Sequence, residues 1–231
     1  MHAKDVMTTN VVTVGPDTDV RTIARSLIER RISAVPVVDQ AGRVVGIVSE
    51  GDLMRRVEAG TERHPSWWLE LLAGPEEKAR DYAKLHGLTA KDVMTRPAVT
   101  VAEDAPLGEI ATLLERHRIK RVPVVRDGTI VGIVSRANLL HGLVAKEAAP
   151  AVASDDAGIR EQVIAGIKAA GITETYVNVV VAGGIVHVWG FVGSEAEKDA
   201  IRIAAETAPG VKTVQNNVAV GAYPVLRGGW A

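Results

Sequence analysis

The chain states one pattern twice, and this internal repeat limits its possible folds more than any other feature. Lys4-Asp5-Val6-Met7-Thr8 returns as Lys91-Asp92-Val93-Met94-Thr95. Further along, Gly46-Ile47-Val48-Ser49 returns as Gly132-Ile133-Val134-Ser135. A repeat of this length indicates two copies of one supersecondary unit, packed by approximate two-fold symmetry. Such a pair forms two related clefts at its seam, and these clefts are the first place to look for function.

Each copy carries the same succession of signals, which predicts a β-α-β-β-α unit with buried strands. Turn residues and an N-cap at 15–19 precede a helix with apolar residues at helical spacing. Two β-rich runs around a turn then predict a hairpin, and Ser49 caps the helix that follows. In the first copy the expected elements are strand 11–14, helix 20–31, strands 34–38 and 43–48, and helix 50–57. The second copy repeats them from residue 98 to about 143.

Residues 58–90 have no counterpart in the other copy and predict a helical linker. Trp67-Trp68 stand out in it. They either pack the linker onto the repeat core or form a self-association surface, because tryptophan is frequent in interface hot spots. Residues 148–157 are rich in Ala, Pro, Ser and Asp and predict a second, interdomain linker.

The C-terminal part predicts a small α-β-β-α-β domain at 158–222, with a tail at 223–231. An amphipathic helix over 159–170 precedes a hairpin of strands 177–181 and 185–192, joined by Ala182-Gly183-Gly184. Ser194 caps a second helix to about Thr207, and a last strand covers 214–220. The residues expected to face inward from the second helix are Ala196, Ala200, Ile203 and Ala204. The whole chain is therefore expected to be α+β.

Composition excludes several classes of function. The net charge is −1, and this balance leaves no basic domain for a nucleic-acid backbone. Cysteine is absent, which excludes disulfides, thiol catalysis and thiolate metal sites. The six histidines show no metal-ligand spacing, and no run approaches the roughly 20 apolar residues of a spanning helix. Without a catalytic constellation or a signal peptide, the chain is expected to be a cytoplasmic protein that is not an enzyme.

The two repeats resemble a tandem pair of CBS domains, often called a Bateman module. The resemblance rests on Asp5-Val6-Met7-Thr8, the run 32–39, and Ser49-Glu50-Gly51-Asp52, with their second-copy equivalents. Residues 155–222 are similar to a BON domain through the run 186–192 and through Gly210-Val211-Lys212. The expected boundaries are first repeat 1–57, linker 58–90, second repeat 91–147, linker 148–157, BON domain 158–222 and tail 223–231.

The CBS resemblance implies a regulatory sensor of an adenosyl ligand such as AMP, ADP, ATP or S-adenosylmethionine, with no required cofactor. Serine at a helix start suits a phosphate, and a carboxylate one turn later can accept both hydrogen bonds of a ribose diol. By the family pattern each site draws on both repeats. The first would use Ile47, Ser49, Asp52, Thr95, Pro97, Val99, Ile119 and Lys120. The second would use Thr8, Asn10, Val12, Ile32, Ser33, Lys120, Arg121, Ile133, Ser135 and Asn138.

The two sites are expected to be unequal. In the second site, Asn138 replaces the carboxylate that would bind the ribose, whereas Lys120-Arg121 add two cations that favour phosphate. We therefore favour the Asp52 site slightly for ribose recognition. The alternative is that Ser49 and Ser135 are ordinary N-caps of empty clefts, in a structural or oligomerisation adaptor.

The family also implies a homodimer through the CBS helices, and a BON domain that contacts a protein or a phospholipid surface. Between residues 155 and 222, five Lys/Arg stand against eight Asp/Glu, which disfavours simple attraction to anionic lipid. A protein-interaction or oligomerisation role is therefore favoured over lipid binding for this domain.

Overall fold

The computed structural model describes residues 1–54, 86–148, 155–172 and 176–221. The predictions for Trp67-Trp68, for most of both linkers and for the tail lie outside these residues. Contacts divide the chain into two compact units. The first unit comprises Met1–Val11, Val101–Val124 and Val131–Ala231; the second comprises Val12–Thr100 and Val125–Ile130. The N-terminal segment of the first repeat is thus grouped with most of the second repeat.

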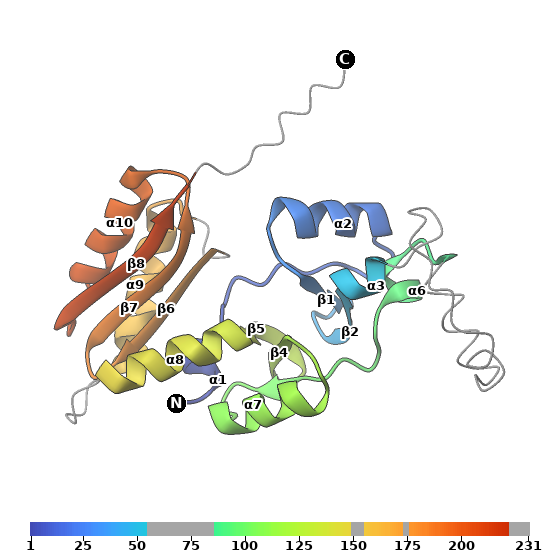
Figure 1. Ribbon diagram of the computed structural model, residues 1–231, viewed down its shortest axis with the longest axis horizontal. Helices are drawn as coiled ribbons and strands as arrows, with labels where there is room; N and C mark the ends of the chain where they lie inside the picture. Colours follow the sequence, from blue (N-terminus) through green and yellow to red (C-terminus); the bar gives the residue numbers. More distant parts are fainter. Residues whose placement is uncertain (55–85, 149–154, 173–175, 222–231) are drawn as a thin grey trace, which may run out of the picture. The chain divides into compact units, whose positions relative to one another are not determined.

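The first repeat contains the predicted helix and hairpin (Figure 1). Asp19 caps the helix, because its Oδ1 accepts hydrogen bonds from the Arg21 and Thr22 amides at 2.8 and 3.4 Å. The two strands pair antiparallel, as predicted. The elements are α1 (Ala3–Val6), α2 (Val20–Glu29), β1 (Ala34–Val38), β2 (Val44–Ser49) and α3 (Glu50–Leu53).

The predicted strand over residues 11–14 was wrong in extent. Only Val14 pairs, through a single parallel bridge to Val37. The turn from Gly15 to Thr18 ends the pairing after Val14, and residues 11–13 form no ladder with β1.

The second repeat follows the same order and adds a short third strand. β3, β4 and β5 form one sheet in that order. The long helix α8 follows Ser135, just as α3 follows Ser49. The elements are α6 (Ala90–Val93), β3 (Val101–Ala102), α7 (Leu107–Arg116), β4 (Arg121–Arg126), β5 (Thr129–Ser135) and α8 (Arg136–Ala148).

The C-terminal domain has the predicted α-β-β-α-β order. Its sheet runs β6-β7-β8, with β6 and β7 antiparallel and β7 and β8 parallel. The Asp156 carboxylate holds the hairpin turn by accepting hydrogen bonds from the Gly183 and Gly184 amides, both at 2.8 Å. The elements are α9 (Asp156–Ala169), β6 (Val177–Ala182), β7 (Ile185–Val192), α10 (Glu195–Glu206) and β8 (Thr213–Val220).

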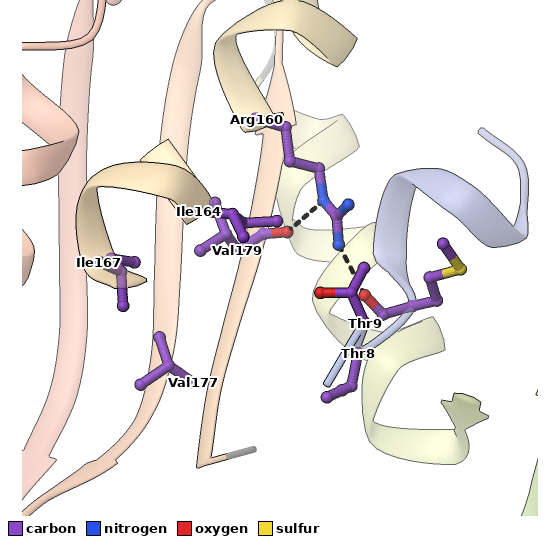
Figure 2. A pocket seen from close by; sticks show the side chains of 8 residues that line it. Thr8, Thr9, Arg160, Ile164, Ile167, Val177 and Val179 are labelled. Atoms are coloured by element: carbon purple, nitrogen blue, oxygen red, sulfur yellow. Dashed lines mark hydrogen bonds between the residues drawn. The ribbon is translucent and has the colours of Figure 1, made fainter. Parts of the chain in front are cut away.

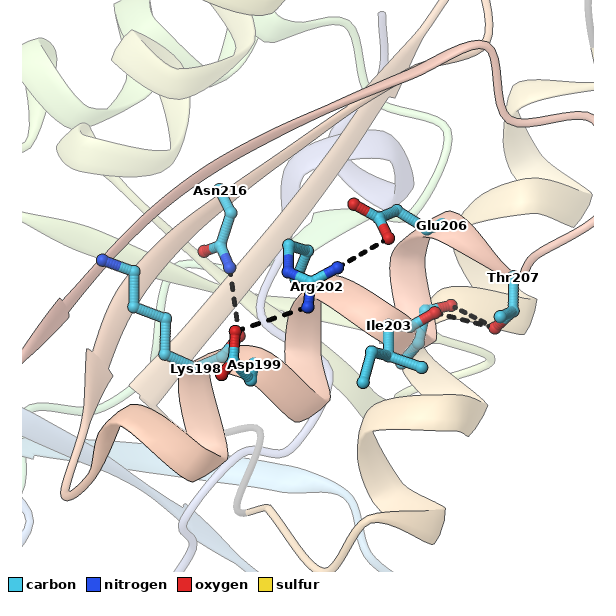
Figure 3. Close-up of polar contacts among 8 residues, drawn as sticks. Lys198, Asp199, Arg202, Ile203, Glu206, Thr207 and Asn216 are labelled. Carbon is cyan, nitrogen blue, oxygen red and sulfur yellow. Dashed lines mark hydrogen bonds and ion pairs between the residues drawn. The ribbon is translucent and has the colours of Figure 1, made fainter.

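The inward face of α10 differs from the prediction. Ile201 and Ala205 are fully buried in the domain core, whereas Ile203 is 51% exposed and Ala196 is also exposed. Ala200 and Ala204 are partly buried against the same core. Arg202 sets the outer face through ion pairs with Asp199 and Glu206 (Figure 3). The helix is therefore rotated relative to the prediction, and the apolar Ile203 lies beside this charged face.

The sheet of the C-terminal domain is covered on both faces. Helices α9 and α10 cover the side that carries Val179, Val186 and Val188. The opposite side contacts α8 and α1 of the same unit, chiefly through β6. There, Val180 and His187 are fully buried although they alternate with the core residues. The domain is thus packed against elements of the second repeat within the first unit.

Aromatic rings lie at the centre of this packing. The His141 ring on α8 stacks on Trp189 at 4.4 Å between centroids, and Trp189 stacks on His187 at 5.3 Å. His141 Nδ1 lies 3.2 Å from Asn178 Oδ1, at hydrogen-bonding distance. Burial lowers the pKa of both histidines below the usual value of about 6.5.

These lowered pKa values predict acid-sensitive packing. Well above pH 6.5 the histidines are neutral in the folded and the unfolded chain, so their contribution to stability is fully present. As the pH falls below about 6.5, the unfolded chain takes up protons first, and stability is lost until the pH passes the lower folded pKa values. We expect the thermal midpoint to fall between pH 7.5 and pH 5, and to fall less in His141→Gln. An equal fall in both proteins would contradict the assignment to His141.

The close approach at Gly190 predicts a second effect on stability. A Cβ at this position would lie 2.0 Å from the carbonyl oxygen of Tyr176, and φ is +150°. Gly190→Ala should therefore lower the free energy of unfolding by about 2 kcal/mol or more, because backbone must move. Gly108→Ala is the control, since nothing lies within 4 Å of its Cβ. Chemical denaturation should show a loss only for Gly190→Ala.

Candidate functional site

The repeated Lys-Asp-Val-Met-Thr segments pair with the hairpin of the other repeat. In the first unit, Thr8 and Ile133 exchange two backbone hydrogen bonds, both of 3.0 Å. In the second unit, Thr95 and Ile47 do the same at 2.9 and 3.1 Å. Each hairpin residue of these pairs immediately follows a repeated glycine, Gly132 or Gly46.

These glycines allow the segments to approach closely. A Cβ on Gly132 would lie 2.4 Å from the sulfur of Met7, and a Cβ on Gly46 would lie 2.3 Å from the sulfur of Met94. The repeated methionine and the repeated glycine therefore form one packing contact that occurs twice. This contact explains why both residue types recur at matching positions in the two copies.

The second unit brings together four residues of the first predicted site. Ser49 Oγ donates to Asp52 Oδ2 at 2.7 Å, and the Ser49 amide donates to the same oxygen at 2.9 Å. Thr95 Oγ1 contacts Asp52 Oδ1 at 3.4 Å, and Thr95 also pairs with Ile47. Pro97 and Val99 follow Thr95 along the chain. The remaining two residues predicted for this site, Ile119 and Lys120, belong to the first unit.

The first unit brings together the corresponding residues of the second predicted site. Asn138 Oδ1 accepts hydrogen bonds from the Ser135 amide and hydroxyl at 2.8 and 2.6 Å. Its amide nitrogen donates to the Val6 carbonyl oxygen at 2.9 Å, beside the Thr8–Ile133 pair. The Lys120 carbonyl accepts a hydrogen bond from the amide directly after Ser135. Asn10 and Arg121 are also in this unit, whereas Val12, Ile32 and Ser33 belong to the second unit.

A serine and a carboxylate three residues apart do not by themselves make a ligand site in this chain. Thr89 Oγ1 donates to Asp92 Oδ2 at 2.6 Å at the start of α6, where no ligand was predicted. That hydrogen bond lowers the pKa of the Asp92 carboxyl group. What distinguishes Asp52 is its contact with a hydroxyl group from the other repeat, Thr95. Polar groups from both repeats therefore meet at Asp52, where one ligand could bind to both.

Asn138 is engaged differently from Asp52. It is 5% exposed, and its two side-chain polar atoms contact Ser135 on one side and Val6 on the other. A carboxylate in this position has no hydrogen to donate to the Val6 carbonyl group. The departure from the family pattern therefore serves a structural contact as well as changing the chemistry of the site.

Sequence reasoning did not find two residues of the C-terminal domain that reach the same segment. Asn178 Nδ2 donates to the Val6 carbonyl oxygen at 2.9 Å, and Arg160 donates to the Met7 carbonyl oxygen at 2.6 Å. Both side chains are 8% exposed. Asn178 carried one visible signal, because it is the only polar residue in the run Val177–Ala182.

The part of the chain that the structure describes offers neither a metal site nor a membrane span. No three side chains among its His, Asp and Glu residues gather closely enough to hold a metal ion. None of its helices combines the length and apolar character that crossing a membrane requires.

Comparisons with known proteins agree with the geometry. The CBS domain model matches residues 3–59 and 90–145, and the BON domain model matches residues 155–222. A protein of Methanocaldococcus jannaschii is 33% identical over 156 residues, which cover 62% of this chain and 92% of that protein. The chloroplastic CBS domain-containing protein CBSX2 of Arabidopsis thaliana is 30% identical over 57% of this chain and 58% of its own length.

A solved structure shows the same fold. The crystal structure of CBSX2 in complex with AMP matches with a TM-score of 0.54 and 29% identity, over 62% of this chain and 96% of that one. The mixed α and β fold expected from the sequence is therefore confirmed. The chain belongs to the CBS-domain proteins, and its tandem pair of CBS domains is followed by a BON domain.

Proposed function

We propose that this chain is a non-catalytic regulatory protein that binds an adenosyl nucleotide between its CBS repeats and signals through its BON domain. One observation carries the proposal: the exchanged N-terminal segment places the Thr95 hydroxyl group beside Asp52 and Ser49. The related CBSX2 structure, in complex with AMP, supports the ligand class. AMP, ADP, ATP and S-adenosylmethionine are the candidates.

Five residues of the first cleft have a role in this proposal. The Asp52 carboxylate accepts hydrogen bonds from the ribose diol, for which it would exchange its present contacts with Ser49 and Thr95. Those two hydroxyl groups then face the phosphate. Ile47 and Val99, both partly buried, pack on the adenine ring.

The second cleft has one feature that favours phosphate binding and one that disfavours ribose binding. Its serine begins α8, which has 13 residues and a dipole that favours an anion at Ser135. Its Asn138 offers a single acceptor oxygen, and that atom already accepts from Ser135. We therefore propose that the second cleft binds phosphate well and ribose less well.

The first test is calorimetric titration of the full chain with AMP, ADP, ATP and S-adenosylmethionine. Asp52→Ala should weaken binding about 10- to 100-fold, because hydrogen bonds to a charged group contribute about 1.5–3 kcal/mol. Asp92→Ala is a matched control, since it removes a carboxylate from the same serine- or threonine-capped arrangement outside both clefts.

The outcomes separate the sensor from an adaptor with empty clefts. Equal affinity in wild type and in Asp52→Ala would place the ligand outside the first cleft. If the folded wild type binds none of the four compounds, the clefts are empty and the CBS pair is a packing module.

A membrane role of the BON domain is the second candidate, and its test is co-sedimentation of the full chain with vesicles. We expect no pelleting with phosphatidylserine vesicles, because acidic residues outnumber basic ones in residues 155–222. Phosphatidylcholine vesicles control for binding that does not depend on charge. Saturable pelleting with either lipid would contradict the proposal of a protein partner.

A further inference from the structure

The backbone segment Val6–Thr8 belongs to two sites at once. It leaves α1 and forms one wall of the second candidate cleft, where Thr8 pairs with Ile133 and Asn138 bonds the Val6 carbonyl oxygen. The side chain of Met7 lies against Gly132, the residue before Ile133 in β5. A ligand bound against Ser135 and Asn138 would therefore lie beside this segment.

The BON domain holds the same segment through two side chains, of which Arg160 is drawn in Figure 2. Arg160 reaches from α9, donating through Nη2 to the Met7 carbonyl oxygen at 2.6 Å and through Nε to the Val179 carbonyl oxygen at 2.8 Å. Asn178 donates to the Val6 carbonyl oxygen at 2.9 Å. These groups are buried, so a donor that lost its acceptor would have no water to replace it.

The Val6 carbonyl oxygen is the point where the two sites meet. It accepts one hydrogen bond from Asn138 of the cleft and one from Asn178 of the BON domain, both of 2.9 Å. A carbonyl oxygen has two lone pairs, and this atom uses both. A displacement of Val6 therefore disturbs the cleft and the BON contact together.

We propose that occupancy of the second cleft and docking of the BON domain are thermodynamically coupled through Val6–Thr8, a proposal that rests on the function proposed above. A ligand that contacts Thr8 while it is paired with Ile133 binds the docked arrangement better. Docking in turn keeps the segment in place for the ligand, since such coupling is reciprocal.

Among the residues that the structure describes, the first cleft has no equivalent link. There, Asp52 takes the position of Asn138, and its carboxylate accepts from Thr95 instead of donating to a carbonyl group. The coupling is therefore assigned to the second cleft, which gives the experiment an internal control.

The test uses the full chain carrying Asp52→Ala, so that AMP titration reports on the second cleft. Asn178→Asp keeps the shape of the side chain but removes the donor to Val6, and it should raise the Kd for AMP at least about fivefold. Asn217→Asp makes the same chemical change at an exposed position of the same domain and should leave the Kd unchanged. If Asn178→Asp fails to fold, Arg160→Lys replaces it, because lysine cannot bond both carbonyl groups in the fork geometry of arginine.

A second measurement needs no substitution at the contact. Saturating AMP should slow amide hydrogen exchange in β6 of the Asp52→Ala chain, and unchanged exchange would overturn the coupling. Equal AMP affinity with and without Asn178→Asp would also overturn it. If wild type binds AMP and Asp52→Ala does not, the coupling is wrong while the proposed function stands. If wild type binds no adenosyl compound, the proposed function fails and the coupling with it.

Discussion

The exchange of N-terminal segments between repeats is the constraint on which the rest of the structure depends. Thr8 is paired with a hairpin more than a hundred residues later in the chain, and Thr95 is paired with one that precedes it. Because each segment leaves its own repeat, neither repeat can complete its candidate site alone. A truncation between the repeats would remove a wall from both sites, so the CBS pair is the smallest unit that can bind a ligand in the proposed way.

The BON domain depends on the same exchange. The contacts of its second sheet face are with α8 of the second repeat and with α1, the short helix that leads into the exchanged segment. The fully buried Val180 and His187 on that face mean that the sheet is an inner layer of the first unit. A partner that bound this face would first have to separate it from α8, whereas the exposed side of α10 is available without any such rearrangement.

Most local structure was predictable from the sequence, because turn residues and caps act over short distances. Asp19, the β1–β2 hairpin and the Gly183-Gly184 turn lie where their residue types predict. The face of α10 was not predictable, since alanine and isoleucine occur on several of its sides and only packing selects Ile201 over Ile203. The prediction of a strand at 11–14 was wrong in extent because β-branched residues indicate an extended backbone but do not show whether a neighbouring strand is there to pair with it.

The docking of the BON domain was missed for a different physical reason. Arg160 and Asn178 are ordinary residues for a helix and a strand, and nothing in their spacing shows that each donates to the backbone of residues 6 and 7. One signal was present in β6, where Val180 and Ala182 are apolar on the face opposite Val179 and Val181. A strand that is apolar on both faces indicates burial on both faces. That pattern predicts that something covers the sheet, but it does not identify α8 as the cover.

The same reasoning changes the meaning of Asn138. Taken alone, the replacement of the ribose-binding carboxylate by an amide would only weaken the ligand site. Within the structure, an amide is the group that can accept from Ser135 and donate to Val6 at once. Asn178 meets the same requirement from the opposite side, and a carboxylate in either position would face the Val6 carbonyl oxygen without a hydrogen between them. The two copies of the repeat have therefore diverged where the C-terminal domain attaches, and the residue that departs from the family pattern is the one that shares an acceptor with that domain.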